Sequence, residues 1–459
     1  MYSVIYFTGL FLISFVFWMN NHFGKVSIDQ LYSIVIFNQQ GVVTANLGFT
    51  ISFIMWCVLI PLGLTFIINK FLSAKLKYIS YILFPVAIAM VSYQFNFMNF
   101  ITQHNVHTDF YSNNYKDPKN IKITAKNPKN LLLIYVESLE TTYSDVNIFH
   151  KDLLYKLTHL NVNHISFSRY EEMPGTNWSI AGMIATQCAL PLKFNGNVKD
   201  KISANKDAPV LPNAKCLSDI LAENGYRNIY MNGSRINFSG VGAFLREHHY
   251  DELYGREKWQ RSGILTKEQM TGWGLPDDML LMLAKMRLSQ LMQTHQHFNL
   301  SLFLIDTHGV SGQLNQTCAK AGYADFEGIV ECTANQVADL VYYIKDKGWL
   351  DTMNIVIIGD HLAMKNLVSR KLETVKKRHI FGMIVSKDKL YKNTDEIVPF
   401  DMLPTMLSSL GFSYQGNQLG LGYSAIGLGN HEPQNRLSML EDNILDESEI
   451  YNKLWESVD

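Results

Sequence analysis

Four residues with side chains that can bind a metal stand directly after apolar stretches in the second part of the chain. They are Glu137, His308, Asp360 and His361. Two carboxylates with imidazole nitrogens suit a hard or borderline divalent ion such as Mn²⁺, Mg²⁺ or Zn²⁺. Taken singly, such a carboxylate is more often a helix cap, and a lone histidine is more often a hydrogen-bonded structural residue. Their shared position after apolar stretches indicates a metal site instead.

Thr176 is the candidate nucleophile. It follows Pro174 and Gly175, which break the backbone, and it precedes Ser179–Cys188, whose pattern predicts a helix. Unpaired N–H groups and the helix dipole favour phosphate at such a helix start. A threonine attacks only if a base or a metal polarises its hydroxyl, and a metal would also stabilise charge on a phosphoryl group. The local sequence alone favours an ordinary N-cap threonine, whereas the candidate ligands elsewhere favour the nucleophile.

The elements that must position these residues are strands of a parallel sheet. Three continuous apolar runs predict strands buried on both faces, and they are Asn130–Val136, Leu300–Ile305 and Asn354–Ile358. Helical patterns such as Leu217–Asn224 and Asp277–Ser289 lie between them. This alternation predicts an α/β fold with a mainly parallel sheet. Since ligands bind beyond the carboxyl ends of such strands, we expect the candidate residues to share one rim.

Residues 1–99 form a predicted membrane domain. They hold only five Asp, Glu, Lys and Arg residues, and three uncharged apolar runs at residues 2–19, 47–68 and 78–95. Each run is close to the ~20 residues that cross a bilayer. The first run lacks a basic flank and a small-residue cleavage site, which favours a retained anchor over a signal peptide. Buried helices of a soluble protein are the alternative.

The lysines between the second and third runs set the predicted topology. Lys70, Lys75 and Lys77 place this loop in the cytoplasm by the positive-inside rule. The N-terminus is then cytoplasmic, and the chain after about residue 96 is external. Residues 100–129 are a predicted linker, residues 130–430 the catalytic domain, and residues 431–459 an acidic tail expected to be a solvated surface helix.

Charge excludes one class of partner. The net charge of −1 provides no basic field for nucleic acid. The basic run Lys371–Arg378 is more typical of a solvated face, with contact to an anionic membrane surface as the alternative.

Four of the five cysteines fall in the predicted external domain. An even count in an oxidising compartment favours disulfides, and sequence proximity favours Cys188–Cys216 and Cys318–Cys332. Free buried cysteines are the alternative. Because no two cysteines have the C-x-x-C spacing, a zinc knuckle is disfavoured.

Several ordered motifs carry a resemblance to a known family. They are Leu133–Glu140, Pro174–Thr176, Ile180–Met183, Gln187–Cys188, Cys216–Leu221, Gly225–Tyr226, Trp273–Gly274, Asp277–Asp278, Asp306–His308 and Asp360–Met364. The chain from about Asn130 to Gly427 resembles the phosphoglycerol transferase I enzymes. These belong to the sulfatase-like branch of the alkaline phosphatase superfamily, together with lipoteichoic acid synthases. The membrane part is similar in architecture only.

The resemblance implies roles for individual residues. Metal ligands would be Glu137, Thr176, Asp360 and His361, with Mn²⁺ as the expected ion and Mg²⁺ or Zn²⁺ as alternatives. Thr176 would be the nucleophile, and His308 would contact the phosphate or protonate a leaving oxygen. Trp178 and Arg235 would line the glycerophosphate pocket. One departure is that His308 and Gly309 are followed by Val310, Ser311 and Gly312, where the family has a second histidine and a proline. The resemblance also implies a bacterial inner-membrane protein with a periplasmic catalytic domain.

The resemblance also implies a reaction. Phosphoglycerol would pass from phosphatidylglycerol in the membrane to Thr176 and then to a periplasmic glucan or a similar acceptor. Phosphatidylethanolamine as donor is one alternative, and a non-catalytic membrane-anchored domain that binds lipid or glycan is another. Sulfatase activity is disfavoured, because Thr176 lacks the C/S-x-P-x-R setting that formylglycine formation requires.

Overall fold

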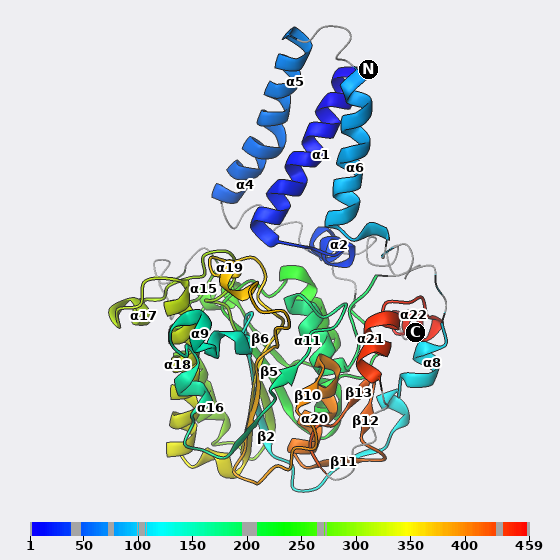
Figure 1. Cartoon of the computed structure of the whole chain (residues 1–459). Helices are drawn as coiled ribbons and strands as arrows, with labels where there is room; N and C mark the ends of the chain where they lie inside the picture. Colours follow the sequence, from blue (N-terminus) through cyan, green and yellow to red (C-terminus); the bar gives the residue numbers. More distant parts are fainter. Residues whose placement is uncertain are drawn as a thin grey trace. The chain divides into compact units, whose positions relative to one another are not determined.

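A computed structural model gives the structure of the protein (Figure 1). It describes residues 2–37, 47–71, 78–98, 100, 106, 108–194, 209–263, 270, 273–427 and 435–456. The chain divides into two compact units, Met1–Val106 and His107–Asp459. Lys75 and Lys77 of the predicted cytoplasmic loop lie outside the described residues, as does the start of the predicted tail.

The first unit is helical. It contains α1 (Tyr2–Phe23), α2 (Ile28–Phe37), α4 (Leu47–Phe53), a π-helical stretch η1 (Ile54–Leu59), α5 (Ile60–Phe71) and α6 (Ser80–Gln94). Two helices, α1 and the continuous stretch Gly48–Phe71, are long and apolar enough to cross a membrane, and α6 is shorter. Only 28% and 17% of their most apolar windows are buried. Since a core helix of a soluble protein hides most of its apolar surface, these helices favour a membrane protein. Three spans remain a prediction.

The second unit is built on a seven-stranded sheet with strand order β3-β9-β8-β2-β7-β5-β6. Five neighbouring strands run in parallel, namely β8 (Met353–Gly359), β2 (Asn130–Val136), β7 (Phe298–Leu304), β5 (Arg227–Asn232) and β6 (Glu252–Tyr254). The remaining two pair antiparallel at one edge, and they are β9 (Gly382–Val385) and β3 (His164–Ser166). The predicted α/β fold with a mainly parallel sheet is confirmed.

Helices cover both faces of this sheet, as Figure 1 shows for α16 and α18 on one side and α11 and α20 on the other. Their bounds are α11 (Ser179–Cys188), α13 (Leu217–Glu223), α16 (Asp277–Leu291), α18 (Phe326–Asp346) and α20 (Met402–Ser409). Alternate residues of β2 face opposite layers. Leu132 and Ile134 pack in the core with α16 and α18. Tyr135 points the other way, and its hydroxyl lies 2.7 Å from Thr186 Oγ1 on α11. Burial of β2 on both faces explains its uninterrupted apolar sequence.

Shorter elements complete the second unit. The helices are α8 (Phe110–Asn114), α9 (Val146–Phe149), α10 (Tyr155–Thr158), α14 (Val241–Glu247), α15 (Arg256–Arg261), α17 (Gln316–Lys320), α19 (Ser369–Leu372), α21 (Arg436–Asn443) and α22 (Glu449–Lys453). Three pairs of strands are β1 (Ile123–Ala125) with β11 (Phe412–Tyr414), β4 (Arg169–Tyr170) with β10 (Glu396–Ile397), and β12 (Gln418–Leu419) with β13 (Gly422–Tyr423). The predicted linker therefore contributes α8 and β1, and β1 pairs with β11 near the end of the domain.

Two disulfides connect helices of this unit, Cys188–Cys216 and Cys318–Cys332. Both predicted pairings are confirmed. Cys188 is the last residue of α11, and Cys216 is the N-cap of α13. The first disulfide thus fixes the far end of the helix that begins at Ser179.

The acidic tail packs onto the domain, so its prediction as a solvated helix is wrong. Arg436 is buried and its guanidinium lies 2.6 Å from Asp401 Oδ1. The Tyr451 hydroxyl is buried and donates to the Pro191 carbonyl oxygen at 2.9 Å. Apolar residues between the acidic ones are buried as well, and they are Leu440, Ile444, Leu454 and Trp455. Their burial outweighs the solvation of the acidic side chains on the opposite faces.

Candidate metal-centred active site

The register of the central strands brings two predicted ligands together. Val136, the last residue of β2, pairs with Gly359, the last residue of β8. The next residues are Glu137 and Asp360, so both carboxylates leave the same edge of the sheet. The Glu137 N–H also donates to the Leu304 carbonyl oxygen of β7 at 3.1 Å, which holds the residue at this edge.

Three predicted ligands form a compact buried cluster. Candidate ligand atoms of Glu137, Asp360 and His361 all lie within 4.8 Å of one another. His361 Nε2 is 3.4 Å from Glu137 Oε1 and 3.2 Å from Asp360 Oδ2. Among the described residues, the buried Asp360 Oδ2 accepts no hydrogen bond. Two carboxylates, an imidazole and an unsatisfied buried oxygen fit a divalent cation, which would be held by these three residues.

Ser138 fixes both carboxylates from the turn after β2. Its backbone has the left-handed φ of 56°, which turns the chain directly after Glu137. The Ser138 N–H donates to Asp360 Oδ1 at 2.8 Å, and its hydroxyl donates to Glu137 Oε1 at 3.0 Å. One carboxylate oxygen on each ligand is thereby oriented by the same residue.

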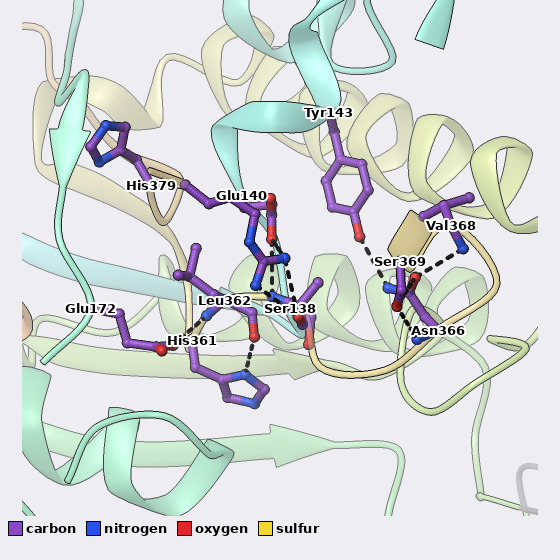
Figure 2. Close-up of polar contacts among 12 residues, drawn as sticks. Ser138, Glu140, Tyr143, Glu172, His361, Leu362, Asn366, Val368, Ser369 and His379 are labelled. Atoms are coloured by element: carbon purple, nitrogen blue, oxygen red, sulfur yellow. Dashed lines mark hydrogen bonds and ion pairs between the residues drawn. The ribbon is translucent and has the colours of Figure 1, made fainter. Parts of the chain in front are cut away.

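His361 is held by its own backbone. Nδ1 lies 2.8 Å from the Leu362 carbonyl oxygen, a contact that requires the proton on Nδ1 (Figure 2). The opposite nitrogen, Nε2, then faces the two carboxylates, where a bound cation would take the place of its proton. This is the arrangement that a metal-binding histidine needs.

The charges of the cluster are strongly coupled. Burial opposes ionisation of Glu137, but His308 and His361 outweigh it and lower the pKa of Glu137 to about 2. Burial and the neighbouring Glu137 raise the pKa of Asp360 to about 7. Burial would lower the pKa of His361, but Asp360 and Glu137 raise it to about 10. The cluster therefore favours positive charge at its centre.

Ser179 is a second hydroxyl residue at this cluster, besides Ser138, and it lies on the pocket side. It is the first residue of α11, and its Oγ lies 3.2 Å from Glu137 Oε2 and 3.5 Å from His361 Nε2. The close approach of α11 depends on Gly182, because a Cβ there would lie 2.0 Å from the Asp360 carbonyl oxygen. A glycine one turn into the helix thus allows Ser179 to reach the metal ligands.

Thr176 occupies a different place from the one predicted. Its hydroxyl accepts from the Met173 N–H at 3.1 Å and donates to the Met173 carbonyl oxygen at 2.7 Å. The side chain is fully buried within this turn. The structure therefore does not bring Thr176 to Glu137, Asp360 and His361, since its hydrogen-bonding capacity is spent on the loop before α11.

A pocket opens beside the cluster, with a volume of about 460 Å³ that includes space open to solvent. Glu137 and Ser179 line it together with Met183, Tyr230, Asn232, Ser234, Arg235, Phe238, Val241, Trp273, Phe303, Ile305 and His308. His308 and Arg235 are therefore at the predicted site. The His308 ring meets the Trp273 ring edge-on at 4.3 Å between centroids, and its Nδ1 is buried without a hydrogen-bond partner in the described part of the chain.

Trp178 lies apart from this lining. It is the buried N-cap of α11, where its carbonyl oxygen accepts from the Gly182 N–H at 2.9 Å. The predicted pocket position of Trp178 is therefore not the one it takes.

Sequence reasoning missed Ser179, Asn232 and Trp273 as site residues. The sequence did contain a signal for Ser179. The helix is predicted to begin at this residue, and a hydroxyl in the first turn of a helix lies at the end where phosphate is expected to bind. Asn232 ends a strand, β5, at the same sheet edge as Glu137 and Asp360. No local signal distinguishes Trp273 from a core aromatic residue.

Comparison with known proteins gives the family. The sulfatase family model matches residues 129–412, more than half of the chain, so the chain belongs to the sulfatase family. The chain is also similar to a named protein. The chain is 35% identical to phosphoglycerol transferase I of Escherichia coli O127:H6 over 324 residues, which are 68% of this chain and 40% of that protein. This confirms the resemblance expected from the motifs. The chain matches less than half the length of this relative.

Solved structures support the fold. A protein of the alkaline phosphatase superfamily from Vibrio parahaemolyticus has a TM-score of 0.52 at 17% identity, over 79% of this chain and 97% of that one. The integral membrane lipooligosaccharide phosphoethanolamine transferase A from Neisseria meningitidis has a TM-score of 0.51 at 12% identity, over 90% and 84% of the two chains. At these identities the likeness concerns the fold alone.

Proposed function

We propose that the protein is a membrane-anchored, metal-dependent phosphotransferase in which Ser179 takes the role first assigned to Thr176. The observation that carries the proposal is the Ser179 hydroxyl, 3.2 Å from Glu137 Oε2 at the edge of the pocket. The name of the similar Escherichia coli protein supports phosphoglycerol as the group transferred. The donor is then phosphatidylglycerol, and the acceptor is a periplasmic glucan or a similar hydroxyl compound.

The first half-reaction loads the serine. The Ser179 hydroxyl gives its proton to solvent. A divalent cation held by Glu137, Asp360 and His361, with Mn²⁺ as the expected ion, would lower the pKa of this hydroxyl. The Oγ–P bond forms as the bond from phosphorus to the diacylglycerol oxygen breaks. His308 donates a proton to that leaving oxygen, and diacylglycerol departs. Placement of Ser179 in the first turn of α11 adds the favourable field of the helix dipole at the phosphoryl oxygens.

The second half-reaction transfers the group. The acceptor hydroxyl gives its proton to His308 and attacks phosphorus, and the P–Oγ bond to Ser179 breaks. Ser179 takes a proton from solvent, so both residues return to their starting state. The half-exposed guanidinium of Arg235 lines the pocket, and its Nη1 lies 3.7 Å from Glu257 Oε1. We assign it to the phosphate or to the glycerol hydroxyls of the substrate.

The apolar helices hold the site near its donor. With α1 and Gly48–Phe71 in the membrane, the domain stays close to the head groups, which raises the effective concentration of lipid. The lysine distribution supports a cytoplasmic N-terminus and a periplasmic domain, and the two disulfides agree with an oxidising compartment.

Mass spectrometry of the protein and its peptides tests the proposal. The full chain in detergent is incubated with Mn²⁺ and phosphatidylglycerol without acceptor, quenched in acid and digested. We expect a phosphoglycerol adduct on the peptide that contains Ser179. An ethanolamine phosphate adduct after incubation with phosphatidylethanolamine, and none with phosphatidylglycerol, would change the donor. Lipid turnover without any adduct would make water the nucleophile and the protein a phosphodiesterase.

A further inference from the structure

One peptide unit next to the metal cluster is clamped from both sides by charged groups. The Leu362 carbonyl oxygen and the Ala363 N–H belong to the same peptide bond. The carbonyl accepts from His361 Nδ1 at 2.8 Å, and the N–H donates to Glu140 Oε2 at 3.1 Å. A buried carboxylate is therefore joined to the imidazole of His361 through a single peptide bond.

The Ala363 N–H and the Arg378 guanidinium hold the Glu140 carboxylate in place and favour its ionised form. Its side chain is fully buried, and Arg378 Nη1 lies 3.0 Å from Oε2. Burial raises the pKa of Glu140, whereas the Arg378 guanidinium favours the ionised form. Arg378 also donates to the Ala363 carbonyl oxygen at 3.2 Å through Nη1, which closes a ring around Ala363. Figure 2 shows Glu140 next to the backbone of Leu362, with His361 on the other side.

We propose that Glu140 is a positioning residue that acts on His361 through the Leu362–Ala363 peptide. A carboxylate that accepts the peptide N–H polarises the peptide, so its carbonyl oxygen becomes a stronger acceptor. A stronger bond at Nδ1 fixes the ring and makes Nε2 a better donor to a metal ion. Metal-binding histidines commonly receive this support from a carboxylate in direct contact; here one peptide bond stands between them. The inference rests on the metal site of the proposed function.

Glu172 provides a matched control. Its Oε1 accepts from the Leu362 N–H at 2.8 Å, so it is also a carboxylate bound to the backbone beside His361 (Figure 2). That N–H belongs to the peptide before the one whose carbonyl oxygen holds His361. Loss of charge at Glu172 removes a similar negative group but leaves the connection from Glu140 to His361 intact.

The test measures metal binding rather than turnover. Full-length wild type, Glu140→Gln and Glu172→Gln are purified in detergent, stripped of metal and titrated with Mn²⁺ by calorimetry. Each is also loaded with Co²⁺, and its visible absorption spectrum is recorded. We expect Glu140→Gln to weaken Mn²⁺ binding by about 10- to 100-fold and to shift the Co²⁺ bands. Glu172→Gln should weaken Mn²⁺ binding less than Glu140→Gln and leave the spectrum unchanged, because its contact lies outside the connected peptide.

Folding is controlled separately. Because Glu140→Gln leaves Arg378 without its carboxylate, the double variant Glu140→Gln/Arg378→Gln removes the buried carboxylate and its partly buried guanidinium partner together. It should show the same weakening of Mn²⁺ binding, with thermal unfolding of the metal-free protein used to confirm the fold. Mn²⁺ binding by either Glu140 variant within twofold of wild type would overturn the inference, as would equal weakening in Glu172→Gln. A wild type that binds no divalent cation would overturn the metal site itself.

Discussion

The hydroxyl of Ser179 and the carboxylate of Glu137 lie 3.2 Å apart, although 42 residues separate them in the chain. Glu137 is fixed at the end of β2 by the sheet, and Ser179 is fixed at the start of α11 by the packing of that helix on Asp360. The proposed nucleophile and one of the candidate metal ligands therefore come from two elements that meet only in the folded domain. This relationship makes Ser179 rather than Thr176 the residue to test first.

Ser179→Ala should abolish transfer. It removes the Ser179 hydroxyl from the candidate metal cluster and leaves Glu137, Asp360, His361 and the Ser138 hydroxyl in place. We expect a folded protein that binds Mn²⁺ but forms no phosphoglycerol adduct, with a rate loss larger than the about 10²- to 10⁴-fold typical of removing one acid–base group. Quantified adduct and calorimetric Mn²⁺ binding are the two measurements. Ser179→Thr should retain part of the activity, since a hydroxyl remains.

Thr176→Ala is the matched control. It removes the two hydrogen bonds to the Met173 backbone, so we expect a stability loss of about 1–2 kcal/mol. The adduct on Ser179 should persist. If Thr176→Ala instead loses the adduct while Ser179→Ala keeps it, the nucleophile is Thr176 and the loop rearranges when substrate binds.

Asp360→Ala should remove bound metal and activity together. The variant takes away one of the two carboxylates that face His361 Nε2, and with it the oxygen that accepts no hydrogen bond. His361→Ala should weaken Mn²⁺ binding less, because it removes a neutral donor. Elemental analysis after dialysis measures the bound metal in both variants. Full metal occupancy in Asp360→Ala would show that the ion sits elsewhere.

Gly182→Ala should damage the site without changing its chemistry. The added Cβ would lie 2.0 Å from the Asp360 carbonyl oxygen, so α11 must move away. Overpacking of this kind costs about 1–3 kcal/mol, and transfer should fall because Ser179 moves with the helix. Gly63→Ala is the control, since its Cβ meets nothing within 4 Å. Thermal unfolding and adduct yield are compared, and equal behaviour of the two variants would refute the packing argument.

Asp219 should make the domain sensitive to acid. Burial opposes its ionisation, but hydrogen bonds from His248, His249 and the Cys216 N–H outweigh it and lower the pKa of Asp219. Because the pKa of Asp219 is lower in the folded state, ionised Asp219 stabilises the fold at pH values above the ordinary aspartate pKa of about 3.9. This stability is lost as pH falls through the lowered pKa.

Asp219→Asn tests the sign of this effect. We expect a lower melting temperature than wild type at pH 7, equivalent to about 1–3 kcal/mol, and a difference that shrinks towards pH 3. Asp339→Asn, at a half-exposed ion pair with Lys156, should be nearly neutral throughout. A difference between Asp219→Asn and wild type that stays constant from pH 7 to pH 3 would contradict the assignment.

The sheet and its rim could be predicted because their signals are local. Uninterrupted apolar runs mark β2, β7 and β8, since each is buried on both faces, and parallel strands place Glu137 and Asp360 at one edge. Cysteine proximity was sufficient for the disulfides because each pair joins neighbouring helices.

The sequence could not separate the two candidate nucleophiles, because Thr176 stands just before α11 and Ser179 is its first residue, three positions later. Thr176 closes a turn with Met173, and that turn is set by tertiary packing of the loop. The tail was mispredicted for a related reason. Its acidic residues are visible in the sequence, but the buried partner of Arg436, Asp401, is 35 residues away. Burial by distant partners carries no local signature.

The metal cluster spans most of the domain's sequence. Ser138, which orients Glu137, donates to Asp360 across 222 residues. No fragment that stops before β8 can contain the complete ligand set, and a chain still emerging during synthesis cannot bind the ion at this site. Metal capture at the proposed site would therefore report that the centre of the sheet has closed, and a metal-loaded chain would be one in which the long-range pairing of β2 with β8 has already formed.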